Sequence, residues 1–258
     1  MVLKKLFGRP APKVEAPQWQ VSAGARVYAI GDIHGRIDLL DDLLDQIAED
    51  DRNSSEARTT LVFLGDLIDR GAGSRAVVER VMALSGGPYE LICLQGNHEQ
   101  LLLNAWDGDR SAVPTFHRAG CRATLISYGV SPEVYDNWDF DELLRQIRNV
   151  IPETHIEFIR QFRHSYRNGD YLFVHAGIRP GVPLAEQRPE DLTWIRHEFT
   201  HSDVDHGVMV IHGHSIRPET DIRHNRIGID TGAYASGILT AIALEDGQRR
   251  FLTGRETH

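Results

Sequence analysis

The fold of this chain is decided by three short motifs, Gly31-Asp-Ile-His-Gly35, Gly65-Asp-Leu-Ile-Asp-Arg-Gly71 and Gly96-Asn-His-Glu99. Each motif follows an apolar run that predicts a buried strand, over Arg26–Ile30, Thr60–Leu64 and Glu90–Leu94. Each therefore places Asp, His or Asn side chains at the end of a strand. Oxygen and imidazole donors gathered in this way suit a pair of divalent cations, which can hold a phosphoryl group and activate a water molecule against it.

Two amphipathic helices are expected between these strands. Apolar residues recur there at helical spacing, first at Leu39, Leu40, Leu43, Leu44 and Ile47, then at Val77, Val78, Val81 and Leu84. Strands that alternate with helices predict a parallel sheet with helices packed against it. Ligands bind at the carboxyl ends of such strands, so we expect the topology to bring the three motifs together.

The pattern changes after the third motif. Residues 101–163 contain helix-prone stretches broken by Gly and Pro, which predicts a mostly helical insert beside the site. A lid over the site and a purely structural cap remain alternative roles for this insert.

Strand-like sequence resumes in the second half of the chain. The first two strands, Asp170–Val174 and Gly207–Ile211, run directly into His175-Ala-Gly177 and His212-Gly-His214. The last three, Arg226–Asp230, Gly237–Leu244 and Arg249–Leu252, are expected to form a meander. Asp230-Thr-Gly232 is interpreted as a turn.

The bulk composition fits one globular domain. The chain has 258 residues, which is long enough to bury a core without disulfides, and its two cysteines suit a reducing cytoplasm. Its net charge of −9 disfavours a nucleic-acid partner. No apolar run predicts a membrane span. We expect a flexible, proline-containing lead-in over residues 1–20 and a single catalytic domain over residues 21–258, while the oligomeric state stays open.

The donors of two metal ions can be assigned from the motifs. Asp66 lies on the middle strand and is the natural bridging carboxylate, because its two oxygens can serve both ions. The full expected set of metal ligands is Asp32, His34, Asp66, Asn97, His175 and His214. A mixed nitrogen and oxygen set favours Mn, Fe, Co or Zn over Ca.

Other residues of the motifs suit phosphoryl transfer. Arg70 and Arg196 are candidates to bind phosphate oxygens, because guanidinium groups match phosphate geometry. His98 is expected to protonate the leaving oxygen, and Asp69 to hold its ring in the right tautomer. The catalytic set is therefore His98, Asp69, Arg70 and Arg196, and the substrate-binding set is Arg70, Asn97, His98 and Arg196.

These motifs resemble the phosphoprotein phosphatase family of the calcineurin-like metallophosphoesterases, in its compact bacterial and phage branch. The likeness covers Arg26 to Leu244 and includes Trp194-Ile-Arg196 and the segment Phe116 to Val130. It implies a four-layer α/β/β/α sandwich with a helical insert, and two divalent ions, Mn²⁺ or alternatively Fe, Zn or Co. It implies direct attack by a hydroxide that bridges the two ions, and the ligand and catalytic roles given above. The family's Gly-His pair selects His214 as ligand, with His212 as the alternative.

The resemblance leaves three functions to compare. The first is a cytoplasmic serine/threonine phosphatase acting on phosphorylated proteins or peptides, with phosphotyrosine as a further substrate. The second is a symmetrical diadenosine tetraphosphate hydrolase, and the third is a phospho-binding module without activity. The hydrolase branch typically lacks the aspartate found here as Asp69 and carries Asp where this chain has Glu99. These two residues therefore favour the protein phosphatase, and the intact ligand set disfavours the inactive module.

Overall fold

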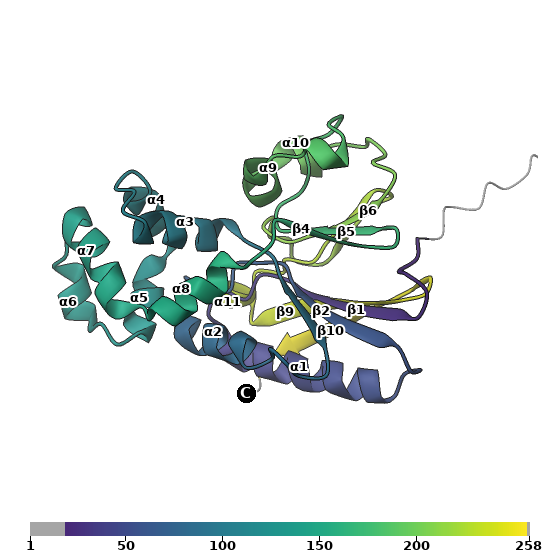
Figure 1. Ribbon diagram of the computed structural model, residues 1–258, viewed down its shortest axis with the longest axis horizontal. Coiled ribbons are helices and arrows are strands. Elements are labelled where there is room, and N and C mark those ends of the chain that lie inside the picture. The colour runs from purple at the N-terminus through teal and green to yellow at the C-terminus, as the bar shows by residue number, and fades with distance from the viewer. Residues whose placement is uncertain (1–18, 257–258) are drawn as a thin grey trace, which may run out of the picture.

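The computed structural model describes residues 19–256, which form two five-stranded sheets stacked face to face with helices outside them (Figure 1). The lead-in expected over residues 1–20 falls almost entirely outside this range. Among the described residues, no helix is long and apolar enough to cross a membrane.

The first sheet has the strand order β10-β9-β1-β2-β3. Its strands are β1 (Ala25–Ile30), β2 (Arg58–Phe63), β3 (Glu90–Cys93), β9 (Ile238–Glu245) and β10 (Gln248–Arg255). The strands β1, β2 and β3 are parallel, as the alternation of strands and helices predicts. The intervening helices α1 (Ile37–Arg52) and α2 (Ser74–Met82) cover the outer face of this sheet (Figure 1).

The second sheet has the order β4-β5-β6-β8-β7. Its strands are β4 (Ser165–Asn168), β5 (Tyr171–Val174), β6 (Met209–His212), β7 (Asp221–Ile222) and β8 (Arg226–Gly228). The expected meander is wrong at its first strand, because β8 pairs with β6 in this sheet. The strands β9 and β10 belong to the first sheet, where they pair antiparallel as expected. Between them the chain crosses from one sheet to the other through α11 (Ala233–Ser236).

Three separate apolar clusters show why the molecule has four layers. Alternate residues of one strand point to opposite faces, so Tyr28 and Ile30 of β1 pack under the helices, while Val27 and Ala29 pack between the two sheets. The third cluster lies between the second sheet and Leu192, Ile195 and Phe199. The predicted α/β/β/α sandwich is therefore confirmed.

The remaining helices lie at one end and on the far face of the sandwich (Figure 1). The end group comprises α3 (Asn97–Trp106), α4 (Val113–Ala119), α5 (Cys121–Ser127), α6 (Pro132–Asp136), α7 (Phe140–Val150) and α8 (Glu153–Arg160). On the far face, the short helix η1 (Leu184–Glu186) precedes α9 (Pro189–Trp194) and α10 (His197–Thr200).

Candidate active site

The candidate site lies where loops from both sheets meet at the carboxyl ends of β1, β2, β3, β5 and β6. Backbone hydrogen bonds join these loops to one another. The amide of His34 donates to the carbonyl of Asp66 (2.9 Å), and the amide of Gly213 donates to the carbonyl of His175 (2.8 Å). The parallel strands thus bring together side chains that lie far apart in the sequence.

Unusual backbone geometry is concentrated in this site. Six non-glycine residues among those described have a positive φ, and five of them are expected site residues: His34, Asp66, Asp69, Arg70 and His214. Such conformations are unfavourable unless the surrounding structure enforces them, and they are frequent at functional sites. The loops are therefore shaped to aim these side chains inward.

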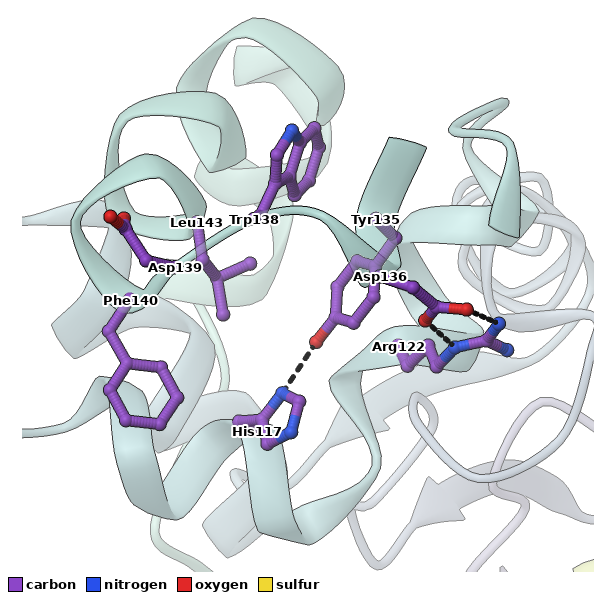
Figure 2. A pocket seen from close by; sticks show the side chains of 8 residues that line it. All are labelled: His117, Arg122, Tyr135, Asp136, Trp138, Asp139, Phe140 and Leu143. Carbon is purple, nitrogen blue, oxygen red and sulfur yellow. Dashed lines mark hydrogen bonds and ion pairs between the residues drawn. The ribbon is translucent and has the colours of Figure 1, made fainter. Parts of the chain in front are cut away.

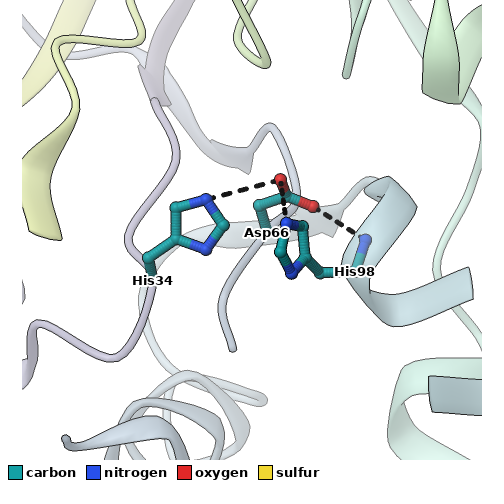
Figure 3. A group of neighbouring side chains, drawn as sticks. All are labelled: His34, Asp66 and His98. Atoms are coloured by element: carbon teal, nitrogen blue, oxygen red, sulfur yellow. Dashed lines mark hydrogen bonds and ion pairs between the residues drawn. The ribbon is translucent and has the colours of Figure 1, made fainter. Parts of the chain in front are cut away.

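The first group of possible metal ligands comprises His34, Asp66 and His98 (Figure 3). Their ligand atoms all lie within 4.8 Å of one another. Asp66 Oδ2 is 3.6 Å from His34 Nε2 and 3.7 Å from His98 Nε2. His98, which the sequence analysis expects to act as an acid, thus occupies a place in this group where Asp32 was expected.

The second group comprises Asp66, His175 and His214. Asp66 Oδ2 is 3.5 Å from His175 Nε2. The same His175 nitrogen lies 3.1 Å from Asn97 Oδ1 and 3.2 Å from His214 Nδ1. Asp66 belongs to both groups, which is the position a bridging carboxylate requires.

The ring orientations of these histidines fit metal binding. His34 and His175 donate Nδ1–H to the carbonyls of Ile68 (2.8 Å) and Leu64 (2.9 Å), which leaves each Nε2 with a free lone pair. The Nε2 lone pair of His175 faces the amide oxygen of Asn97, and two acceptors in contact repel unless a cation lies between them. Metal-bound histidines commonly donate their second nitrogen to a backbone carbonyl in this way.

The electrostatic environment favours, at His34, His214 and Asp66, the protonation states that metal binding requires. Burial lowers the pKa of His34 to about 3 and that of His214 to about 2, so both imidazoles are neutral at pH 7. Burial alone would raise the pKa of Asp66, but His175, His98 and His34 outweigh it and hold that pKa below its usual range. Neutral imidazoles around an ionised carboxylate are the forms that bind divalent cations.

Asp32 lies beside these groups without joining either. Its carboxylate accepts the backbone N–H of His214 at 3.0 and 3.2 Å. Burial raises its pKa well above the usual value, and the nearby carboxylates of Asp230 and Asp66 raise it further. A Cβ atom at Gly213 would lie 2.0 Å from Asp32 Oδ1, so this position needs glycine.

Asp230 is a site neighbour that the sequence motifs did not indicate. Its backbone is held by Arg217, whose amide donates to the Asp230 carbonyl (3.0 Å), and its side chain accepts the amide of Gly232 (2.9 Å). Burial raises the pKa of Asp230 to about 6. The signal was available, because Asp230 follows a strand just as Asp32 and Asp66 do.

His212, the alternative ligand, lies outside both groups. It is buried, its Nδ1 is 3.0 Å from the carbonyl oxygen of Gly213, and its ring packs against Phe199 with centroids 5.1 Å apart. The structure therefore places His214, and not His212, beside Asp66 and His175.

The expected acid and its partner form a buried network. His98 Nδ1 lies 2.6 Å from Asp69 Oδ2, and Thr124 Oγ1 donates to the other carboxylate oxygen of Asp69 (2.5 Å). Burial lowers the pKa of His98, but Asp66 and Asp69 outweigh it and raise this pKa above its usual value. Thr124 comes from α5, and no sequence motif marks it as a site residue.

Both expected phosphate-binding arginines line one cavity of about 300 Å³, together with His214, Arg217 and Tyr234. Arg70 Nη2 is 3.3 Å from His98 Nε2, and its guanidinium carbon lies 4.7 Å from the centre of the Tyr234 ring. Arg196 is exposed and lies between α9 and α10. The cavity therefore joins the metal-ligand groups to a positively charged opening.

Glu99 holds two of the motif loops together. Its buried carboxylate accepts the backbone N–H groups of Asp66 and Leu67, both at 2.8 Å, and that of Gly96 at 3.0 Å. The side chain thus faces backbone amides and does not reach the cavity. Its role is to fix the loop that carries Asp66.

Another cavity, of about 570 Å³, lies among the end helices (Figure 2). It is lined by His117, Tyr135, Trp138, Phe140 and neighbouring residues, and His117 Nδ1 lies 2.9 Å from the Tyr135 hydroxyl. None of the expected site residues lines this cavity.

The four-layer fold and the two ligand groups that share Asp66 define a metallophosphoesterase. The sequence model of the calcineurin-like phosphoesterases matches residues 25–234, and the chain belongs to this family. It is accordingly a hydrolase of a family that uses divalent metals.

Curated relatives are named for nucleotide substrates. The chain is 35% identical over 154 residues to a symmetrical bis(5'-nucleosyl)-tetraphosphatase of Acidovorax ebreus (strain TPSY), a match that covers 60% of this chain and 44% of that protein. It is 24% identical over 241 residues to an asymmetrical bis(5'-nucleosyl)-tetraphosphatase of Halalkalibacterium halodurans, covering 83% of this chain and 87% of that protein. The chain thus matches less than half the length of the symmetrical relative.

Solved structures show the same fold. A putative diadenosine tetraphosphatase aligns with a TM-score of 0.62 at 22% identity, covering 92% of this chain and 97% of that one. A cold-active protein tyrosine phosphatase aligns with a TM-score of 0.56 at 20% identity, covering 97% of this chain and 89% of that one. At these identities the fold is shared, and the substrate does not follow from it.

The expectation of a serine/threonine phosphatase acting on phosphorylated proteins or peptides is wrong, because the curated relatives are named for dinucleoside tetraphosphates. The structure explains the error. The two residues that favoured a protein phosphatase, Asp69 and Glu99, are fully buried and bind His98 and the loop backbone. Neither side chain lines the cavity, so neither is placed to select the substrate.

Proposed function

We propose that this protein is a metal-dependent hydrolase of dinucleoside polyphosphates that cleaves bis(5'-nucleosyl)-tetraphosphates symmetrically. Addition of one water molecule to the central phosphoanhydride would give two nucleoside diphosphates. The observation that carries the proposal is the 35% identity to a symmetrical tetraphosphatase over 154 residues. The arginine-lined cavity beside the ligand groups supports it, since a tetraphosphate chain brings several negative charges to the site.

The proposed metal ligands are those expected from the sequence, with Asp66 shared between two ions and His34, Asn97, His175 and His214 around it. Asp32 belongs to this set as a carboxylate at its edge. Mn²⁺ is the proposed ion, with Fe, Zn or Co as alternatives. When bound, the ions would neutralise phosphate charge and lower the pKa of a coordinated water.

The chain's own residues would orient the substrate and move a proton. Arg70 and Arg196 would bind oxygens of the phosphate under attack, because both guanidinium groups line the cavity. His98 would give the proton at Nε2 to the departing phosphate oxygen while Asp69 fixes Nδ1 at 2.6 Å. These roles are part of the proposal.

In the test, metal-stripped protein is reloaded with Mn²⁺ and is then assayed in parallel on diadenosine tetraphosphate and on a phosphoserine peptide. We expect faster turnover of the dinucleotide, with ADP as its only nucleotide product. Asp66→Asn should abolish it, whereas His224→Asn, which changes an exposed histidine outside the site, should not. Faster release of phosphate from the peptide would refute the proposal, and formation of AMP and ATP would refute symmetrical cleavage alone.

A further inference from the structure

Within the described part of the chain, three arginines of the cavity have no carboxylate partner. Among residues 19–256, Arg70, Arg196 and Arg217 form no ion pair with Asp or Glu, although the chain carries a net charge of −9. Nearby, Arg223 pairs with Asp221 at 2.7 Å. Unpaired guanidinium groups that line one cavity of an acidic protein indicate a binding site for a polyanion.

Arg217 is placed at this cavity by the same loop that carries a metal-ligand candidate. It follows His214 by three residues, and its amide donates to the carbonyl of Asp230 (3.0 Å), which fixes the loop beside Asp32. Its side chain is exposed and lines the cavity together with Ser215 and Ile216. Arg217 thus adjoins the ligand groups without belonging to them.

The number of arginines exceeds what one phosphate requires. A phosphate monoester presents charge only at the phosphorus under attack, where Arg70 and Arg196 are already proposed to bind. A polyphosphate chain carries further charged groups on either side. The cavity volume of about 300 Å³ is at the small end of the range for ligand pockets. The space beside the attacked phosphate therefore suits further phosphate groups better than a nucleoside.

We propose that Arg217 binds a phosphate next to the one under attack and thereby makes the site favour polyphosphate chains over phosphate monoesters. This inference rests on the proposed function and names the feature of the substrate that the site selects. A guanidinium group can form two parallel hydrogen bonds to one phosphate, so its loss should raise the KM for a polyphosphate.

The test compares Arg217→Gln with Arg223→Gln, a control that removes an exposed arginine already paired with Asp221. The kcat/KM values are measured for diadenosine tetraphosphate and for p-nitrophenyl phosphate at a fixed concentration of free Mn²⁺. In Arg217→Gln we expect the ratio of the two to fall roughly tenfold or more, through KM, as loss of a charged hydrogen bond implies. Arg223→Gln should keep the wild-type ratio.

A second measurement does not depend on dinucleotide turnover. Inorganic tripolyphosphate and orthophosphate are compared as inhibitors of p-nitrophenyl phosphate hydrolysis, again at fixed free Mn²⁺. The wild type should bind tripolyphosphate more tightly than orthophosphate, and Arg217→Gln should lose most of that difference. If the wild type does not cleave the dinucleotide, the proposed function fails while this comparison still tests Arg217. An unchanged preference for tripolyphosphate in Arg217→Gln would overturn the inference.

Discussion

Replacing Glu99 with glutamine tests whether this carboxylate holds the loops that carry the ligands. In the native protein Oε2 accepts the N–H groups of Asp66 and Gly96, and Oε1 accepts that of Leu67. A glutamine has one carbonyl oxygen, which can serve the first pair. Its NH₂ group would then face the N–H of Leu67, so that two buried donors oppose each other.

The size of the effect follows from these contacts. A hydrogen bond to a charged group contributes about 1.5–3 kcal/mol, and a buried donor left without a partner costs about 1–3 kcal/mol. Burial and the neighbouring Asp66 raise the pKa of Glu99 to about 7, so relief of this repulsion offsets part of the loss. We therefore expect Glu99→Gln to lower the free energy of unfolding by about 2–4 kcal/mol.

Urea unfolding of the metal-free protein measures this change directly, and calorimetric titration with Mn²⁺ measures whether the displaced loop also weakens metal binding. Glu56→Gln is the matched control, because Glu56 is exposed and has no hydrogen-bond or ion-pair partner among residues 19–256. The control should unfold within about 0.5 kcal/mol of the wild type. A Glu99→Gln protein that matched the control in both measurements would refute the assignment of Glu99 as the link between the loops.

Three further predictions use other contacts of the described residues. Arg26→Met should cost about 3–5 kcal/mol in urea unfolding at pH 7, because Arg26 is buried and pairs with Glu245 at 2.7 Å. The Arg26 hydrogen bond lowers the pKa of Glu245 in the folded protein. The stability that the pair contributes is therefore present above the ordinary glutamate pKa and is lost as pH falls through the pKa of folded Glu245. A stability difference between variant and wild type that grew in acid would contradict this prediction. Thr124→Val should lower kcat with little change in KM, because the Thr124 hydroxyl donates to Asp69 and valine has none. Thr124→Ser keeps the hydroxyl and should recover most of the lost kcat. Equal losses in both variants would point to packing instead. His98→Asn should reduce turnover of a phosphoserine peptide more than that of diadenosine tetraphosphate. A nucleoside diphosphate is a better leaving group than an alkoxide, so its departure depends less on protonation by His98. A larger loss of turnover with the dinucleotide would speak against His98 as the acid.

The parts of the fold that were predictable depend on local patterns. The continuous apolar runs of β1 and β2, and the helical spacing of leucines in α1, follow from contacts with the nearest layers. Parallel pairing of β1, β2 and β3 then places Asp32, Asp66 and Asn97 at one edge of the sheet. The side chains of Ile227 and Ile229 pack between the two sheets, where strands of either sheet contribute apolar residues. Hydropathy alone does not tell which of the two sheets such a strand joins, so the expected meander failed at its first strand.

The parts of the site that were missed arise from contacts that no spacing encodes. Thr124 meets Asp69 across 55 positions in the sequence, and Asp230 reaches Asp32 only because the chain crosses between the sheets after β8. Both residues stand in ordinary helix or turn sequence, where a capping or loop role is the better expectation. Such neighbours become visible only when the tertiary structure is known.

On the roles proposed above, the residues of the reaction and the residue that selects its substrate lie in different parts of this chain. Asp66, His98 and Glu99 stand in contiguous motifs because metal and proton chemistry need donors at short, fixed distances. Arg217 stands outside every motif, and the cavity that it shares with Arg70 is what places it beside the proposed ligands. Motif residues can therefore be identical in enzymes with different substrates, which is why the motif position of Glu99 was a poor guide to function. The number of guanidinium groups that line the cavity is a better guide to the substrate, because guanidinium groups beyond those that one phosphate can bind favour a substrate with further negative charges.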